Sequence, residues 1–369
     1  MAVPAEPVIL LVGAGHAHLG VIDDWISRGA PRGRTILVEP LDAMRYSGMV
    51  PGWIAGEYRA DELSIPLAPL VDEAGIDWRR TRLASLDPRD KVVQLADGTQ
   101  IAFDICSIAT GSAGRAGKVL GGGYPRILDI RPLDRFIERW SELRSQAPER
   151  GRIAVIGGGA GGVELAFGLR NARYWPGAEV MLVAGAAGLL PSHSVAVRTR
   201  VERELARQGI NVIAADAEMR GGELYAGAGS LEPLDLVVAA VGSGAPDWPR
   251  DSGLPVDGDG FIRVDAQQRV CGHPHILATG DIARRTDRAV THSGVHAVYA
   301  GPVLAANLRR LAQGDEPRRS YSPRFMDFYL LNTCRGEAIA SYGALGLQSR
   351  ALRRMKDWLD RRWITRFTR

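Results

Sequence analysis

The stretch that decides the fold is RIAVIGGGAGGVELAFGLR, residues 152–170. The aliphatic run at 153–156 predicts a buried strand, and VELAFGLR predicts a helix that follows a glycine-rich turn. Glycines at GxGxxG spacing permit the tight turn and let the backbone approach a pyrophosphate, which a helix N-terminus attracts. The stretch therefore predicts a dinucleotide-binding unit. Its candidate binding residues are Gly157, Gly159, Gly161 and Gly162, with Gly242 after a later strand.

The second strand of this unit, EVMLVAGAAG, lacks the acidic residue that usually bonds a ribose hydroxyl. Val183 and Ala184 stand where that acid is expected, and the nearest arginines are Arg198 and Arg200. Two interpretations stay open. The site binds a nicotinamide dinucleotide with little discrimination between NADH and NADPH, or it has lost its ligand.

The stretch VILLVGAGHAHLG, residues 8–20, predicts a first site of the same kind. Gly13 and Gly15 fit the turn, but His18 stands where the third glycine is usual. The next predicted strand, RTILVEP, carries Glu39 at its end, where a carboxylate can accept hydrogen bonds from a ribose. We expect His16 and His18 to pack or hydrogen-bond within the loop, because neither has a carboxylate or cysteine near it in sequence.

Composition excludes several classes of protein. The net charge of +4 over 369 residues is too small to indicate nucleic-acid binding. Three cysteines without a CxxC pair argue against a metal site and a disulfide framework, and they fit a reducing compartment. The N-terminus lacks the basic region of a signal peptide, and we see no apolar run long enough to span a bilayer. We therefore expect a cytoplasmic protein.

Two more stretches, FDICSIATGS at 103–112 and HPHILATGDIA at 273–283, are apolar strands that end in Ala-Thr-Gly. The second is followed by THSGVHAVYAGPVLAANL at 291–308. This order of motifs resembles the two-dinucleotide-domain flavoproteins of the pyridine nucleotide-disulfide oxidoreductase superfamily, in the type II NADH dehydrogenase-like branch. GAGHAH, YSGMVPGWIAG, GVELA and KDWLDRRW are most similar to the proteins fused ahead of selenophosphate synthetase.

The resemblance implies FAD in the first site and NAD(P)H as the co-substrate in the second. It implies that Asp281 holds the ribityl chain and that a helix from about Gly294 points its N-terminus at the flavin. It also places Glu164 near the nicotinamide, as a candidate catalytic residue. The candidate FAD residues are Gly13, Gly15, His16, Ala17, Glu39, Ala109, Thr110, Gly111, Gly280, Asp281, Gly294 and Val295.

The sequence differs from the family pattern at several positions, and these differences limit the reactions that the protein is expected to catalyse. RYSGMVPGW carries no CxxxxC, which excludes disulfide reductase chemistry. Cys334 is the candidate for thiol chemistry of the sulfide:quinone type, although three buried and inert cysteines are the favoured interpretation. Gly294 and Val295 replace the Ala-Gln pair that many type II dehydrogenases have near their quinone site, which leaves the acceptor open.

The C-terminal segment 350–369, RALRRMKDWLDRRWITRFTR, predicts a basic amphipathic helix. Eight basic and two acidic residues give it a charge of +6. Its predicted apolar face consists of Leu352, Met355, Leu359, Trp363 and Phe367. A membrane surface is the expected partner. Packing on its own domain and docking to a partner protein stay open.

The predicted fold is α/β, with two Rossmann-like dinucleotide-binding domains, one inserted in the other, plus a small C-terminal sheet and an amphipathic helix. The FAD domain spans 1–115 and 260–315 and includes a β-meander at 77–103. The NAD(P)-binding domain spans 116–259, the small sheet 316–348 and the helix 349–369.

The predicted function is an FAD-dependent NAD(P)H dehydrogenase that passes electrons to a quinone or a similar acceptor at the inner face of the membrane. One alternative is a flavoenzyme that oxidises a sulfide or selenium species without using nicotinamide. The other is a flavin-bearing binding or scaffold protein with a vestigial second site. The sequence decides neither the donor and acceptor nor whether the chain forms a homodimer.

Overall fold

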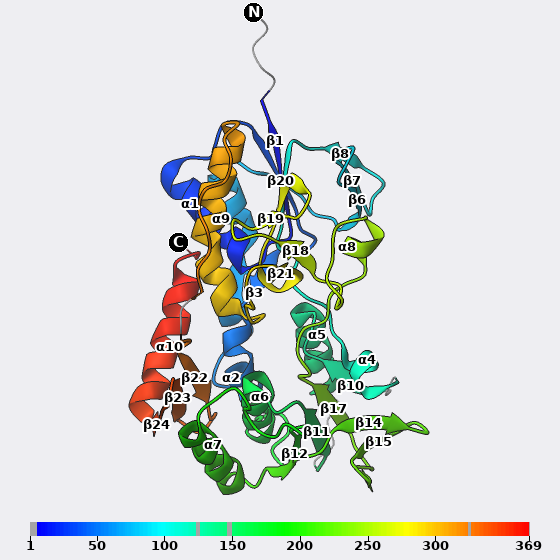
Figure 1. Ribbon diagram of the computed structural model, residues 1–369. Helices are drawn as coiled ribbons and strands as arrows, with labels where there is room; N and C mark the ends of the chain where they lie inside the picture. Colours follow the sequence, from blue (N-terminus) through cyan, green and yellow to red (C-terminus); the bar gives the residue numbers. More distant parts are fainter. Residues whose placement is uncertain (1–5, 123–125, 146–149, 324–325, 369) are drawn as a thin grey trace, which may run out of the picture.

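The computed structural model describes residues 6–122, 126–145, 150–323 and 326–368 of the chain. Within them lie two large sheets, several small antiparallel sheets and a C-terminal helix (Figure 1). Helices connect most of the successive parallel strands of the two large sheets, as expected for parallel pairing. The predicted α/β fold with two Rossmann-like units is confirmed.

The first large sheet is built around β1, which pairs in parallel with β2 on one side and β9 on the other. All residues of β1 after Val8 are buried, because helices and further strands cover both faces of the sheet. Its strands, in spatial order, are β21 (Ala283–Arg285), β18 (Ile262–Val264), β19 (Arg269–Val270), β20 (His273–Ala278), β9 (Ile105–Ile108), β1 (Val8–Val12), β2 (Arg34–Val38) and β5 (Asp77–Arg79).

Two long helices pack closely against each other beside this sheet, α1 (His16–Arg28) and α9 (Gly294–Ala312). A Cβ atom at Gly20 would lie 3.2 Å from Cα of Gly301, so glycine at both positions allows the close approach. The predicted helix start near Gly294 is correct, because α9 begins at that residue. A shorter helix, α3 (Leu67–Glu73), also contacts α1.

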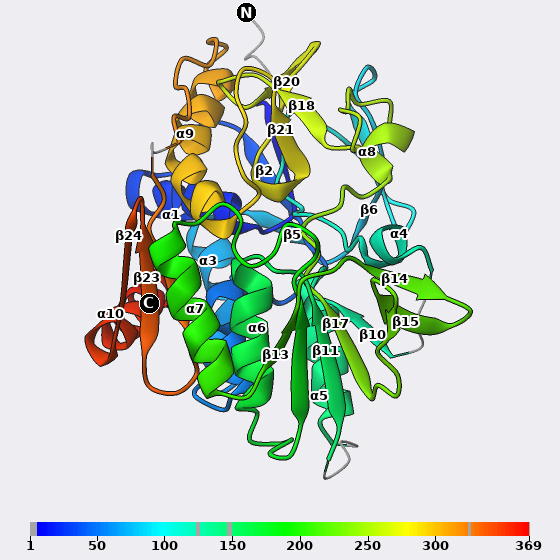
Figure 2. The same cartoon turned by 60° about the horizontal axis from the view of Figure 1, so that its bottom comes forward.

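The second large sheet is entirely parallel. Figure 2 brings it forward, with α6 and α7 beside it. Its strands, in order, are β10 (Ile127–Asp129), β17 (Leu236–Ala239), β11 (Arg152–Ile156), β12 (Glu179–Val183) and β13 (Asn211–Ile213). Its helices are α4 (Ala116–Leu120), α5 (Leu133–Leu143), α6 (Ala160–Arg170) and α7 (Val195–Arg207). The domain boundaries at 115/116 and 259/260 lie in segments that connect the two sheets, and they stay predictions.

Smaller elements fill the connections. The expected meander at 77–103 is partly wrong, because Asp77–Arg79 joins the first large sheet beside β2 and only β6 to β8 form the three-stranded unit. The small strands are β3 (Ala43–Arg45), β4 (Ser64–Pro66), β6 (Leu83–Asp87), β7 (Val92–Leu95), β8 (Gln100–Ala102), β14 (Ala217–Arg220), β15 (Glu223–Ala226) and β16 (Gly229–Ser230). The short helices are η1 (Ser47–Met49), α2 (Val50–Ile54), η2 (Asp61–Leu63), α8 (Trp248–Asp251) and η3 (Gly280–Ile282).

The C-terminal part forms an antiparallel sheet of β22 (Tyr329–Asn332), β23 (Ala338–Tyr342) and β24 (Leu345–Ser349). The last helix, α10 (Arg350–Thr365), begins where the Ser349 hydroxyl accepts a hydrogen bond from the Leu352 amide. The sheet contacts α6 and α7 as well as α10, so it joins the last helix to the second large sheet.

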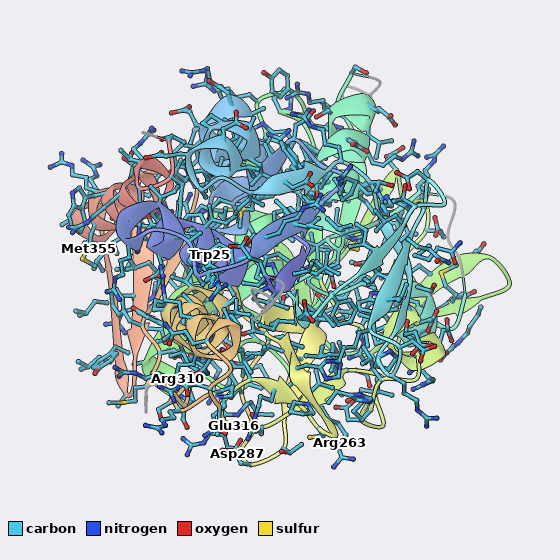
Figure 3. The ribbon with its side chains drawn as sticks, turned by 90° about the horizontal axis from the view of Figure 1, so that it is seen from above. Trp25, Arg263, Asp287, Arg310, Glu316 and Met355 are labelled. Atoms are coloured by element: carbon cyan, nitrogen blue, oxygen red, sulfur yellow. The ribbon has the colours of Figure 1, made fainter. Side chains whose placement is uncertain are left out.

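The predicted C-terminal helix is correct, and its predicted apolar face is divided between the core and the surface, since Phe367 is buried and Trp363 packs on the core. The buried residues of the helix are Lys356, Asp360 and Ile364, whereas Leu359 is 40% exposed. In Figure 3, Met355 lies at the outer edge of the molecule. The helix therefore packs on its own chain through a partly charged face, and Leu359 is partly exposed where it lines the large cavity. None of the helices in the described part of the chain has the length and apolar content that a bilayer crossing needs.

Candidate functional site

The first glycine turn lies between β1 and α1. Gly13 has a φ of +85°, and a Cβ atom there would lie 2.8 Å from the Ala109 carbonyl oxygen. A Cβ at Gly15 would lie 2.5 Å from the same oxygen, so the end of β9 requires both glycines. No side chain caps α1, whose first amides thus remain available to an anion. This geometry fits a pyrophosphate.

The Glu39 carboxylate, just after β2, supports this turn. It accepts hydrogen bonds from the Ala14 amide at 2.8 Å and the Leu41 amide at 2.9 Å. Burial raises the pKa of Glu39, and the two amide hydrogen bonds counteract that rise. The arrangement fits the ribose-binding role expected of Glu39, which stays a proposal.

The two histidines of the turn have different environments. His18 is fully buried, and its ring bonds the Gly13 carbonyl and the Ser107 hydroxyl, so it packs and hydrogen-bonds as expected. His16 contacts Tyr46 and Trp363, with ring centroids 6.0 and 5.0 Å away. Its Nε2 is buried without a hydrogen-bond partner in the described residues. Burial lowers the pKa of both imidazoles to about 4, which keeps them neutral at pH 7.

The Nε2 atom of His16 faces the start of α9. A Cβ atom at Gly294 would lie 3.4 Å from it. Ser293 caps α9 by accepting a hydrogen bond from the His296 amide, and Val295 is partly exposed and lines the adjoining cavity. An unpaired buried nitrogen next to a helix N-terminus fits the polar edge of a flavin ring.

Asp281 is buried in η3, and its carboxylate forms an ion pair with Arg131 at 3.1 Å. Arg131 follows β10 of the second sheet, so this pair joins the two large units. Gly280, with a φ of +75°, and Asp281 line a small cavity of about 40 Å³ together with His292. A buried carboxylate at that place fits the ribityl hydroxyls of FAD.

The second glycine turn has the geometry expected from its sequence. A Cβ atom at Gly157 would lie 2.3 Å from the Ala240 carbonyl oxygen, and one at Gly162 would lie 1.9 Å from the Gly157 carbonyl oxygen. These two glycines are required by the fold. By contrast, Gly159, Gly161 and Gly242 face open space. That space is where a dinucleotide would lie.

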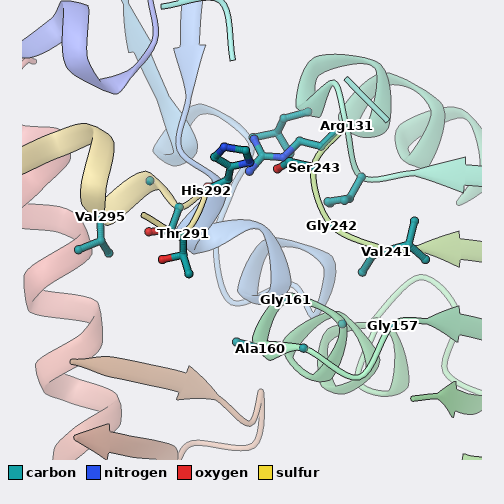
Figure 4. Close-up of a pocket in the computed structure, with 18 of the residues that line it drawn as sticks. Arg131, Gly157, Ala160, Gly161, Val241, Gly242, Ser243, Thr291, His292 and Val295 are labelled. Atoms are coloured by element: carbon teal, nitrogen blue, oxygen red, sulfur yellow. The ribbon is translucent and has the colours of Figure 1, made fainter. Parts of the chain in front are cut away.

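Both halves of the molecule contribute to one large cavity of about 1790 Å³. Figure 4 shows Gly157 and Gly161 on one side of it and Thr291, His292 and Val295 on the other. His16, Arg131, Glu164 and Gly294 also line the cavity. Among the other expected FAD residues, Ala17 is buried at the start of α1 against Gly301, and Ala109, Thr110 and Gly111 follow β9 beside the first turn.

Glu164 points from α6 toward the C-terminal part of the chain. Its Oε1 accepts a hydrogen bond from the Asn332 amide at 2.8 Å. Burial raises the pKa of Glu164, and the Lys356 ammonium opposes that rise. Lys356 itself donates to the Gly48 carbonyl at 3.0 Å and to Asp360 at 2.9 Å. Burial lowers its pKa, but Glu164 and Asp360 more than offset this and hold the pKa above its usual value.

Tyr46 belongs to the same group of polar residues as Glu164, Lys356 and Asp360. Its hydroxyl donates to Asp360 at 3.0 Å, and its ring stacks on Trp363 with centroids 4.7 Å apart. Sequence reasoning missed Tyr46, Lys356, Asp360 and Trp363 as cavity residues. The four-residue spacing of Lys356 and Asp360 was a usable signal for an ion pair, but nothing local in sequence places it beside Glu164.

None of the three cysteines is among the residues that line the large cavity. Cys106 lies inside β9 and Cys334 in the turn between β22 and β23, and burial raises the pKa of both thiols. The favoured interpretation of three buried cysteines is wrong for Cys271, which is partly exposed.

The chain is similar to several characterised proteins. It is 25% identical over 275 residues to ferroptosis suppressor protein 1 of Taeniopygia guttata, covering 69% of each chain. It is 27% identical over 306 residues to the demethylphylloquinone reductase NdbB of a Synechocystis strain, covering 77% of this chain and 73% of that one. The fold is similar to that of NDH2 from Plasmodium falciparum in complex with NADH, with a TM-score of 0.80, 12% identity and 98% of each chain covered.

A family model also matches most of the chain. It describes the pyridine nucleotide-disulphide oxidoreductases and aligns with residues 8–301, which include both glycine turns and η3. The match confirms the resemblance expected from the order of the motifs. The chain belongs to the pyridine nucleotide-disulphide oxidoreductase family.

Proposed function

We propose that this protein is an FAD-dependent NAD(P)H dehydrogenase that passes electrons to a quinone or a similar acceptor. The observation that carries the proposal is the shared cavity of about 1790 Å³, in which the second glycine turn faces His16 and Gly294 of the first unit. Two ligands bound by the two units can therefore meet. When bound, FAD supplies the hydride and electron chemistry that the side chains lack.

The residues of the first unit would hold FAD along its length. Gly13, Gly15 and Glu39 suit the adenosine diphosphate part, and Asp281 suits the ribityl chain. His16 and the α9 N-terminus at Gly294 suit the flavin ring. The open sides of Gly159, Gly161 and Gly242 suit NAD(P)H.

Glu164, Lys356 and Tyr46 would hold and transfer protons beside the flavin and nicotinamide rings. Reduction of a quinone consumes protons, and Lys356 Nζ and the Tyr46 hydroxyl carry them at the wall of the cavity. Exposed apolar residues at the cavity, Val295, Tyr299 and Phe328, suit the entry of an apolar acceptor. The names of NdbB and of the NADH-bound NDH2 structure support a quinone and NADH as the substrates.

We also propose that α10 attaches the protein to the inner face of the membrane. Trp358 is 55% exposed and lies outside the cavity lining, and Leu359 is 40% exposed at the cavity. The charge available to a lipid surface is smaller than the +6 of the sequence. Arg353, Lys356, Arg361 and Arg366 pair with carboxylates of the chain. Arg350 and Arg354 form no ion pair within the described residues and suit anionic headgroups.

An anaerobic titration of the purified protein with NADH and then NADPH tests the proposal through the visible absorbance of the flavin. Rapid bleaching by either nucleotide is the expected result. If FAD is bound and dithionite reduces it but neither nucleotide does, the dehydrogenase proposal is wrong. Sulfide and selenide would then be tested as donors, and slow reduction despite tight nucleotide binding would favour a scaffold protein.

A further inference from the structure

The second unit has no acid directly after β12, where Glu39 stands after β2 in the first unit, and the backbone register allows the two units to be compared residue by residue. The amide of Gly13 bonds the Val38 carbonyl at 2.9 Å, and the amide of Gly157 bonds the Val183 carbonyl at 2.8 Å. The two glycine turns are therefore joined to their second strands in the same way. Glu39 and Ala184, the residues after Val38 and Val183, occupy equivalent positions.

The equivalence extends to the chain that follows each strand. In the first unit, the amide of Leu41, two residues after Glu39, donates to the Glu39 carboxylate at 2.9 Å. In the second unit the corresponding amide, that of Ala186, donates to the Asp216 Oδ1 at 2.9 Å. A carboxylate thus bonds the same backbone group in both units, although in the second it comes from the segment after β13.

Glycine at position 185 makes room for this carboxylate. Gly185 has a φ of +76°, and a Cβ atom there would lie 3.2 Å from Asp216 Oδ1. The backbone of Asp216 is itself held, because its carbonyl accepts the Gly227 amide at 3.1 Å. Within the described residues, no cation pairs with Asp216, and the Arg200 guanidinium donates back to the Ala196 carbonyl of its own helix.

We infer that Asp216 replaces the missing ribose acid of the second unit and makes it select NADH over NADPH. The inference rests on the proposed binding of a nicotinamide dinucleotide by the second turn. A carboxylate there can accept a hydrogen bond from the 2′-hydroxyl of NADH, whereas it repels the 2′-phosphate of NADPH. An arginine, which would favour the phosphate, does not stand at Ala184 or Gly185.

Binding of two probes tests the inference without any flavin chemistry. The holoenzyme is titrated by calorimetry with ADP-ribose and with 2′-phospho-ADP-ribose. The same variants are assayed for kcat/KM with NADH and NADPH. Asp216→Asn keeps an oxygen that can accept the Ala186 amide but loses the charge. Glu218→Gln removes a nearby carboxylate that pairs with Arg220 on β14 and serves as the matched control.

The wild type should bind ADP-ribose about tenfold more tightly than its 2′-phosphate. Asp216→Asn should remove most of this preference, and Glu218→Gln should retain it. Equal affinities in the wild type, or an unchanged preference in Asp216→Asn, would overturn the assignment of Asp216 while the proposed dehydrogenase stands. If neither probe binds, the second site does not hold a nicotinamide dinucleotide, and the proposed function fails together with the inference.

Discussion

Lys356 Nζ lies 2.9 Å from Asp360 Oδ2, one turn further along α10, and both side chains are less than a tenth exposed. The pair lies between Tyr46 of the first unit and Glu164 of the second, so the last helix forms part of the cavity wall. A basic tail helix is usually solvated on its charged side, but here one lysine of that helix is buried where the helix packs on the rest of the chain.

Replacing Asp360 should destabilise the protein strongly. Asp360→Asn leaves the Lys356 ammonium buried without its nearest counterion, which typically costs about 3 kcal/mol or more. Urea unfolding followed by circular dichroism measures the change. Glu142→Gln breaks the exposed Arg139–Glu142 pair and should cost less than about 1 kcal/mol. Similar costs for the two variants would show that the Lys356–Asp360 pair is hydrated in solution.

Glu164→Gln should change how stability depends on pH. Because burial raises the pKa of Glu164, the folded state holds its proton more tightly than the unfolded state, whose Glu pKa is about 4.3. Between the two pKa values the unfolded state binds fewer protons, so this group makes stability fall as pH rises. The free energy of unfolding of the wild type relative to Glu164→Gln should therefore decrease from pH 4 upward. A constant difference between the two proteins would show that Glu164 has its ordinary pKa.

The local parts of the site could be predicted from the sequence. Gly13, Gly157 and Glu39 are identified by spacings within one strand–turn–helix–strand unit, and such units form from contacts close in sequence. The electrostatic interaction of Glu164 with Lys356 could not be predicted in this way, because it arises only when α10 packs on the small C-terminal sheet and on the first unit.

The division of the predicted apolar face of α10 has a related cause. Periodicity grouped Leu359 with Trp363 and Phe367 on one apolar face, but the helix covers a polar cavity wall, so Lys356 and Asp360 are buried and Leu359 is partly exposed at the cavity. Asp216 was missed because its equivalence to Glu39 depends on strand register and on a neighbouring strand, neither of which a single motif contains.

Glu39→Ala should weaken FAD retention. The substitution leaves the Ala14 and Leu41 amides without their acceptor and removes the carboxylate proposed to bond the ribose. The loss of about 1–2 kcal/mol corresponds to roughly a tenfold weaker affinity. The ratio of flavin absorbance to protein absorbance, and the Kd on reconstitution with FAD, measure it. Asp42→Asn, which removes an exposed partner of Arg80, should retain FAD fully.

Two adjacent glycines of the second turn should respond in opposite ways. Gly161→Ala places a methyl group in open space at the cavity and adds helix propensity, so stability should rise by up to about 1 kcal/mol while the KM for NADH increases. Gly162→Ala places Cβ against the Gly157 carbonyl and should cost about 3 kcal/mol. Thermal unfolding and steady-state kinetics separate the two effects. An unchanged KM in Gly161→Ala would argue that the dinucleotide does not lie over this turn.

The outer side of α10 should bind anionic lipid. Combining Trp358→Ala, Arg350→Gln and Arg354→Gln removes an exposed aromatic ring and two unpaired charges without touching the cavity. Each basic residue near an anionic surface contributes about 1 kcal/mol, so co-sedimentation with vesicles that contain phosphatidylglycerol should weaken by about tenfold or more. Tyr174→Ala is the matched control, because Tyr174 is also 55% exposed and stacks with an arginine, Arg144, away from α10. If the triple variant and the control sediment like the wild type, α10 serves only to close the cavity, and the proposed membrane attachment is wrong.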